Sequence, residues 1–192
     1  DCDIIIIASG VGRRPGDTRL DLAQNNVNII KSVAAEIKPH YNGAVILMVA
    51  NPVDVLTYVM YKELGIESSK IFGTGTALDT ARFKYFLSQE LDVAVNNVHG
   101  YIIGEHGDSQ FPVRSSMNIA GSPLAEYCEA NNRSIDLEAI ADHVKNAGAE
   151  VIKRKKATYY AIASSVCRIV NAIIKDEHAV LPVSTVECDS YG

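Results

Sequence analysis

Cysteine is scarce in this sequence, and its spacing excludes two kinds of protein. Cys2, Cys128, Cys167 and Cys188 stand far apart and form no CxxC pair. A small disulfide-stapled domain or a zinc site needs paired or regularly spaced cysteines. We therefore expect buried or half-buried thiols and no bound metal. Since no signal-peptide pattern opens the chain, the expected location is the cytoplasm.

Long basic blocks and long apolar runs are also missing. The longest basic run is Lys153–Lys156, and 18 Lys and Arg face 23 Asp and Glu, a formal net charge of −5. This balance argues against a nucleic-acid partner. The longest apolar runs, Ile4–Ala8 and Ala44–Ala50, are far shorter than the roughly 20 residues that cross a bilayer, which argues against membrane insertion. With 47% hydrophobic residues among 192, the chain can bury a sizeable core.

The first part of the sequence alternates short apolar runs with amphipathic segments. The apolar runs predict buried parallel strands at Ile4–Ile7, Ala44–Ala50 and Lys70–Gly73. Apolar residues at helical spacing predict helices at Asp17–Lys38, Asp54–Leu64 and Ala77–Leu91. Strands and helices that alternate with short connections predict an α/β fold with a doubly wound parallel sheet.

After His99 the pattern changes. Antiparallel strands or sheet edges are predicted at residues 101–104 and 111–120, and a β-rich tail at 179–186. Ser134 is predicted to open one helix, and residues 144–174 a long helical stretch with kinks near Gly148 and within 153–158. We expect a domain boundary near Gly75, with an α+β domain after it.

The two ends of the chain are abrupt. It opens inside a predicted strand without an initiator Met, and it stops shortly after Asp189. We interpret the sequence as a piece of a longer protein.

Small polar residues follow all three predicted parallel strands, at Ser9–Gly12, Asn51–Asp54 and Thr74–Thr76. Any one of these segments can be an ordinary turn. In open α/β sheets, however, ligands bind outside the carboxyl ends of the strands. The three together favour a nucleotide-type ligand.

The segment Gly12–Arg19, GRRPGDTR, is rich in glycine and proline and holds three arginines. It can be a solvated basic loop, or a lid that closes cations over an anionic substrate. Cations at a helix N-terminus oppose the helix dipole, so the lid is favoured.

Two more motifs carry ionisable side chains. Asp79 and Arg82 lie three residues apart on a predicted helix and share a face, which can also be an ordinary surface ion pair. His106 stands between two glycines in the segment GEHGDS. An imidazole there is open to a ligand, and a carboxylate such as Asp79 can fix its tautomer.

Together these motifs resemble the lactate/malate dehydrogenase family, with the lactate branch closer. The segments GRRPGDTRLDL, NPVDVLTY, GTGTALDTARF and IIGEHGDS occur in the family's order, and the similarity continues through KRKKATYYAIA to VLPVSTVECDSYG. The resemblance implies NAD-dependent interconversion of pyruvate and L-lactate. Residues 1–74 would be the C-terminal part of a Rossmann-type NAD-binding domain, and 75–192 an incomplete substrate domain. The family's Gly-rich first unit would precede the chain.

The resemblance also implies individual roles. His106 would exchange a proton with the substrate oxygen, Asp79 would orient its imidazole, and Arg19 would polarise the reacting carbonyl. Arg82 would grip the substrate carboxylate. Other residues that would line the substrate are Arg13, Asn51 and Thr158. The residues that would line NAD are Gly10, Val11, Ser32, Val49, Ala50, Asn51 and Thr74.

Arg13 departs from the lactate pattern, which commonly has Gln at this position. A cation there suits the second carboxylate of oxaloacetate, whereas the methyl group of pyruvate offers it no partner. The surrounding motifs are of the lactate type. Lactate dehydrogenase activity is therefore the first hypothesis, and malate dehydrogenase activity remains the alternative.

Two other classes of protein are compatible with a nucleotide-binding α/β fold. A non-catalytic nucleotide-binding or structural member has no reason to keep His106, Asp79, Arg82 and Arg19 together. A P-loop enzyme is excluded because no GxxxxGK[ST] segment occurs.

Lys84 and His99 suggest regulation. They fall where bacterial lactate dehydrogenases place a basic pair that binds fructose 1,6-bisphosphate across a subunit interface, although the family usually has Arg in place of Lys84. They can equally be a surface lysine and a strand-start histidine. The resemblance further implies a homotetramer, allosteric control and a place in glycolysis.

Overall fold

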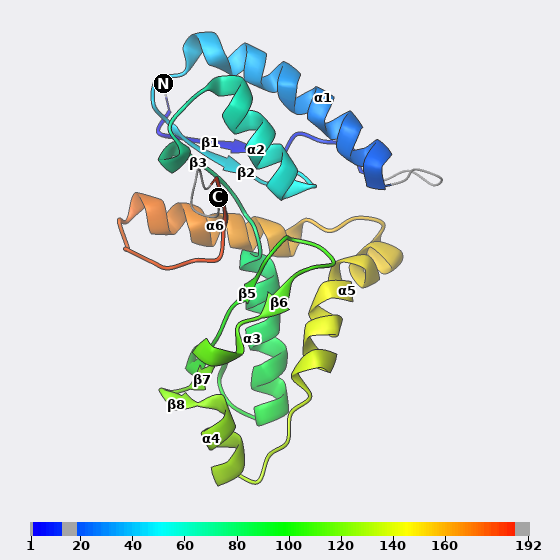
Figure 1. Ribbon diagram of the computed structural model, residues 1–192, viewed down its shortest axis with the longest axis vertical. Coiled ribbons are helices and arrows are strands. Elements are labelled where there is room, and N and C mark those ends of the chain that lie inside the picture. The colour runs from blue at the N-terminus through cyan, green and yellow to red at the C-terminus, as the bar shows by residue number, and fades with distance from the viewer. Residues whose placement is uncertain (1, 13–18, 187–192) are drawn as a thin grey trace, which may run out of the picture. The chain divides into compact units, whose positions relative to one another are not determined.

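The computed structural model describes residues 2–12 and 19–186, and these form two compact units (Figure 1). The first unit contains the described residues up to Gly75 together with residues 183–186. The second contains residues 76–182.

The first unit is built on a sheet in which the described residues supply four strands, in the order β1-β2-β3-β9. The strands are β1 (Ile4–Ile7), β2 (Val45–Met48), β3 (Ile71–Gly73) and β9 (Ser184–Thr185). β1, β2 and β3 are parallel, with Ile4 opposite Val45 and Ile46 opposite Ile71. The predicted parallel strands are confirmed, although β2 is shorter than the predicted segment.

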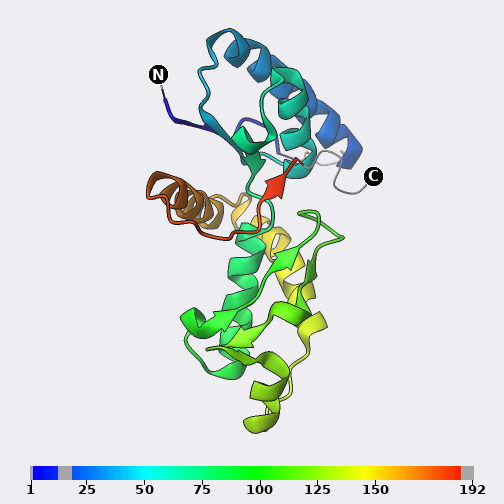
Figure 2. The same ribbon diagram turned by 60° about the vertical axis from the view of Figure 1, so that its left-hand side comes forward.

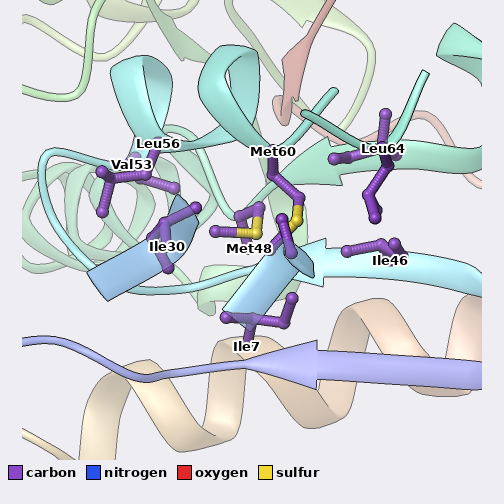
Figure 3. Close-up of a cluster of buried hydrophobic side chains, with 10 residues drawn as sticks. Ile7, Ile30, Ile46, Met48, Val53, Leu56, Met60 and Leu64 are labelled. Carbon is purple, nitrogen blue, oxygen red and sulfur yellow. The ribbon is translucent and has the colours of Figure 1, made fainter. Parts of the chain in front are cut away.

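Two helices cover one face of this sheet. They are α1 (Arg19–Ile37) and α2 (Val53–Leu64). Apolar residues recur every three or four positions along both helices and therefore lie on one side of each helix. They pack against the sheet in a hydrophobic core (Figure 3). Ile30 of α1 and Met60 of α2 are fully buried there. α1 ends before the short 3-10 helix Lys38–His40, and α2 ends at Gly65, whose φ of 68° is left-handed.

One strand prediction is wrong in detail. β1 was expected to be buried on both faces, and Ile7 is indeed 3% exposed, but Ile6 is 47% exposed. Successive side chains of a strand point to opposite faces, so Ile7 packs into the core with α1 and α2, while Ile6 points to the other face of the sheet and is exposed.

The second unit is organised around α3 (Ala77–Leu91), whose bounds match the prediction. α5 (Leu137–Lys155) and α6 (Tyr160–Ile174) pack against it, and α4 (Leu124–Ala130) lies against short strands. Figure 2 shows these strands, in green, running alongside α3. They are β4 (Val98–His99), β5 (Ile102–Ile103), β6 (Phe111–Pro112), β7 (Asn118–Ile119) and β8 (Ser122–Pro123). All their pairings are antiparallel, which agrees with one of the two alternatives predicted for residues 101–104 and 111–120; β4 and β8 lie outside the predicted ranges. The remaining short 3-10 helices are Ser68–Lys70, Val95–Asn97 and Arg114–Ser116.

The helices of the second unit differ from the predictions at the start of α5 and in the presence of α4. Ser134 does not open α5; Asp136 does, because its carboxylate accepts a hydrogen bond from the Ala139 amide at 3.0 Å. α5 runs through Gly148 without ending and stops before Lys156, whose φ is 65°. The predicted break within 153–158 is therefore confirmed, whereas the predicted kink near Gly148 stays a prediction. α4 was not predicted.

The tail returns to the first unit. Instead of a long β-rich segment, β9 alone forms, antiparallel to β3. Gly75, with φ of 48°, makes room for it, since a Cβ there would lie 2.6 Å from the backbone nitrogen of Ser184. The hydroxyl of Ser184 also donates a hydrogen bond to the carboxylate of Asp54 in α2.

The cysteine prediction is only partly right. Cys128 is half-buried. Cys2, which precedes the first strand, is exposed, and so is Cys167, which lies on an exposed face of α6. All three are free thiols. Cys188 lies outside the described residues.

Within residues 2–12 and 19–186, none of the helices is both long enough and apolar enough to cross a membrane. The same ranges contain no group of three or more His, Cys, Asp and Glu side chains placed to hold a metal ion.

Candidate active site

A buried carboxylate meets a histidine in the second unit. Asp79 lies in the first turn of α3 and is 2% exposed. Its Oδ2 is 2.6 Å from Nδ1 of His106, which belongs to the loop between β5 and β6. A carboxylate acceptor favours the imidazole form with its hydrogen on Nδ1. Nε2 is then the ring nitrogen that can exchange a proton with a substrate.

The loop that carries His106 is tight for local reasons. Gly104 has a φ of 92°, which few side-chain-bearing residues adopt, and a Cβ there would lie 3.1 Å from the Ser109 carbonyl. The Ser109 hydroxyl donates a hydrogen bond to Oε2 of Glu105 at 2.7 Å. These contacts close the loop around His106.

Arg82 lies one turn further along α3. A terminal nitrogen of its guanidinium is 3.6 Å from Oδ1 of Asp79, and its side chain is 16% exposed. Burial lowers the pKa of Arg82 from its ordinary value, and the negative charge of Asp79 partly opposes that change. A guanidinium nevertheless stays charged at neutral pH, and its fork of donors can bind a carboxylate through two bonds. The second unit thus places a cation that is chemically able to bind a carboxylate beside a carboxylate–imidazole pair.

Two threonines connect the start of α3 to β5: Thr76, noted from the sequence only as part of a polar segment after a strand, and Thr80, which the sequence did not single out. The Thr76 hydroxyl donates to the Ile102 carbonyl at 2.6 Å, and the Ile102 amide donates to Oγ1 of Thr80 at 2.9 Å. Both threonines are buried. They fix the strand that leads to His106 against the helix turn that carries Asp79. Their four-residue spacing on either side of Asp79 is the signal that would have found them.

The first unit brings other predicted residues to one edge. Gly10 and Val11 follow β1, and Ala50 and Asn51 follow β2, so all four lie at the carboxyl ends of adjacent parallel strands. The Asn51 side chain is exposed. The buried Asn26 of α1 holds this edge together through hydrogen bonds to backbone groups of Val11 and Asn51. Sequence reasoning missed Asn26, although a polar residue one turn before the core residue Ile30 was a usable signal.

The other cofactor candidates differ in position. The Val49 amide donates to the Ile7 carbonyl at 2.9 Å, and the amide of the buried Thr74 donates to the Met48 carbonyl at 2.9 Å. Ser32 lies further along α1, exposed, and its hydroxyl donates to the Asn28 carbonyl of the same helix.

The remaining candidates are distributed as follows. Thr158 is exposed in the connection between α5 and α6. Lys84 is half-buried on α3, and His99 is exposed on β4, which packs against α3. Arg19 is the first residue of α1, and Arg13 lies outside the described residues.

The edge of the first unit suits the nicotinamide end of a dinucleotide. Val11 is 38% exposed, and Gly10 is so close to its surroundings that a Cβ would lie 3.3 Å from the Ala50 Cβ. These residues offer backbone groups and small apolar surfaces without charge, against which a flat ring can pack. They do not supply a glycine-rich turn of the kind that cradles a pyrophosphate.

Comparison with known families decides the classification. Residues 1–73 match the family model described as "lactate/malate dehydrogenase, NAD binding domain", and residues 76–192 match "lactate/malate dehydrogenase, alpha/beta C-terminal domain". The chain belongs to the lactate/malate dehydrogenase family. The resemblance inferred from the motifs and the α/β fold class are both confirmed.

Curated relatives in the family carry the name L-lactate dehydrogenase. "L-lactate dehydrogenase 1" of Clostridium acetobutylicum is 48% identical over 193 residues, which cover 99% of this chain and 62% of that protein. L-lactate dehydrogenase of Acetivibrio thermocellus is 46% identical and matches 100% of this chain, again over 62% of its own length. The chain therefore spans about three-fifths of the length of these relatives.

Solved structures of the family have the same fold. A lactate dehydrogenase from a Medee basin deep-sea metagenome library superposes with a TM-score of 0.93 at 42% identity. The minor L-lactate dehydrogenase of Enterococcus mundtii, in its ligands-bound form, gives a TM-score of 0.93 at 44% identity. Each match covers 100% of this chain and 62% of the other.

Proposed function

We propose that the complete protein containing this chain is an NAD-dependent L-lactate dehydrogenase that interconverts pyruvate and L-lactate. The observation that carries the proposal is the cluster of Asp79, His106 and Arg82, which combines a proton-exchanging imidazole with a carboxylate-binding cation. Residues 1–74 contribute to the NAD-binding domain, and residues 75–192 form part of the substrate domain. The names of the curated relatives support lactate.

The three residues divide the work on the substrate. Arg82 binds the carboxylate of pyruvate and so fixes the orientation of its carbonyl. His106 gives a proton from Nε2 to the carbonyl oxygen and takes it back in the reverse direction. Asp79 stabilises the imidazole in its protonated form, because its carboxylate is only 2.6 Å from Nδ1. NAD, when bound, supplies and accepts the hydride.

The other predicted residues complete the proposal. By the family resemblance, Arg19 would stabilise the charge that develops on the carbonyl oxygen, and Arg13 would contribute to substrate binding. Asn51 and Thr158 line the substrate. The residues that hold the cofactor are Gly10, Val11, Ser32, Val49, Ala50, Asn51 and Thr74.

Regulation and assembly follow from the same resemblance. Lys84 and His99, on packed elements of one unit, are proposed to bind fructose 1,6-bisphosphate between the subunits of a homotetramer. The free thiols of Cys2, Cys128 and Cys167 suit a reducing compartment, so we place the enzyme in the cytoplasm, in glycolysis. Light scattering of the complete protein, and its turnover with and without the effector, test these points.

The decisive experiment compares substrates. The complete protein is assayed with NADH and either pyruvate or oxaloacetate, together with the His106→Asn and Arg13→Gln variants. We expect kcat/KM to favour pyruvate in the wild type, and His106→Asn to lose several orders of magnitude in kcat with NADH affinity nearly unchanged. No turnover of either keto acid would support a non-catalytic protein. A preference for oxaloacetate that Arg13→Gln abolishes would show a malate dehydrogenase.

A further inference from the structure

The side chain of Asn26 links two loops of the first unit. It is 1% exposed, although it is polar and lies within a helix. Its Oδ1 accepts a hydrogen bond from the Val11 amide at 2.8 Å. Its Nδ2 donates to the Asn51 carbonyl at 2.7 Å and to the Val11 carbonyl at 3.2 Å.

These bonds use both ends of the amide. A side-chain amide has one acceptor oxygen and two N–H donors, and here each has a backbone partner. Aspartate would keep the acceptor but turn a second oxygen toward two carbonyls, and leucine would bind neither loop. The three hydrogen bonds therefore require a carboxamide at this position. Packing of the helix alone would not require one.

Gly10 is matched to this amide. A Cβ built on Gly10 would lie 3.3 Å from Oδ1 of Asn26 and equally far from the Ala50 Cβ. A side chain at residue 10 would therefore press on the amide. The side-chain amide of Asn26 thus fixes the position of the loop after β1, and the loop after β2 is hydrogen-bonded to the same amide.

We propose that Asn26 is a positioning residue that sets the distance between Val11 and Asn51, and through them the seat of the nicotinamide end of the cofactor. The inference rests on the proposed function, which places both residues beside the cofactor. Since Asn26 is 1% exposed, we expect it to act without contacting substrate or cofactor. Its effect passes through the backbone of the two loops.

The test uses the complete protein with the Asn26→Asp variant, and Asn25→Asp as a matched control. Asn25 is the neighbouring residue on α1 and is exposed. Losing two donor bonds, each worth about fivefold in an equilibrium, should raise the Kd for NADH by about 5- to 25-fold. We expect kcat to fall by about tenfold or more and the Val11 amide to exchange hydrogen faster. Asn25→Asp should change each quantity less than twofold.

Several outcomes would overturn the proposal. A folded Asn26→Asp variant with wild-type NADH affinity and wild-type kcat would do so. So would a variant whose activity falls only in proportion to its folded fraction, because that is a purely structural role. Should Asn26→Asp fail to fold, Gly10→Ala presses on the same amide while keeping its bonds. It should raise the NADH Kd measurably, and an unchanged Kd in folded Gly10→Ala would overturn the proposal.

Failure of the proposed function would look different. If the wild type binds NADH but turns over no pyruvate, the dehydrogenase assignment is lost. NADH affinity and exchange at the Val11 amide still report on Asn26 in that case.

Discussion

Replacing Asp79 by asparagine removes one negative charge from the candidate site and almost no volume. The carboxylate is nearly completely buried, and it faces Nδ1 of His106 at 2.6 Å and the guanidinium of Arg82 at 3.6 Å. Its hydrogen bond to a protonated imidazole is charge-assisted. Such bonds contribute about 1.5–3 kcal/mol, so their loss corresponds to about 10- to 150-fold.

The effect of Asp79→Asn should appear in kcat more than in KM. His106 would lose the group that stabilises its protonated form, and the new amide can hold the ring in the wrong tautomer, which lowers kcat beyond the electrostatic loss alone. Arg82 keeps its charge and can still bind the substrate carboxylate, so KM for pyruvate should move by only a few-fold. We expect kcat to fall by at least tenfold, measured in the complete protein with both substrates saturating.

Asp92→Asn provides the control, because Asp92 is an exposed residue at the other end of α3. Its left-handed φ of 56° is tolerated by asparagine. This variant should match the wild type. The double variant Asp79→Asn/His106→Gln should be no slower than the worse single variant, since the two residues act as a unit. An Asp79→Asn enzyme that keeps more than a third of wild-type kcat, with an unchanged melting curve, would refute the coupling of the two side chains.

Three further predictions concern stability and reactivity. Thr80→Val leaves the buried Ile102 amide without its acceptor and should lower the free energy of unfolding by about 1–3 kcal/mol in urea titration. Thr80→Ser keeps the hydroxyl and should lose less than half as much. Equal losses in the two variants would contradict a stabilising hydrogen bond from the Ile102 amide. Gly73→Ala would place a Cβ 2.5 Å from Oγ1 of the buried Thr57, and overpacking of this kind should cost about 1–3 kcal/mol in the same titration, so an unchanged midpoint would show that β3 can shift. Burial raises the pKa of the Cys128 thiol, so a smaller fraction of it is thiolate at pH 8.5. Iodoacetamide should therefore alkylate Cys128 more slowly than the exposed Cys167. Equal alkylation rates in peptide mapping by mass spectrometry would contradict the protection of Cys128 by burial.

The parts of the fold that could be predicted from sequence depend on local patterns. The bounds of α3 follow from the apolar spacing between Ala77 and Leu91, and α2 ends at Gly65 because a left-handed residue is needed there. The partner of β9 could not be predicted in this way. Its pairing with β3 depends on a close approach at Gly75 by residues more than 100 positions away, which no local pattern encodes. α4 was missed because seven residues are too few to show a helical period.

The residues of the candidate site also differ in whether a local pattern marks them. His106 could be singled out because an imidazole is unusual in a glycine-flanked loop. Asp79 and Arg82 could be noted as a pair on one helix face, and the family motifs then supplied the roles of all three. Asn26 and Thr80 carry no such mark. Asparagine or threonine in a helix is commonly a solvated surface residue, and only the tertiary structure shows that these two are buried.

Buried polar residues such as Asn26 and Thr80 are explained by the backbone that they serve. Where a strand of the sheet ends, its N–H and C=O groups leave the ladder, and a buried group without a partner costs free energy. The Asn26 amide supplies partners for both backbone groups of Val11, and Thr80 supplies one for the amide of Ile102. Each side chain thereby selects one conformation for the loop that follows. Because the proposed reactive residues lie in or beside those loops, the geometry of the site depends on polar residues that never meet the substrate.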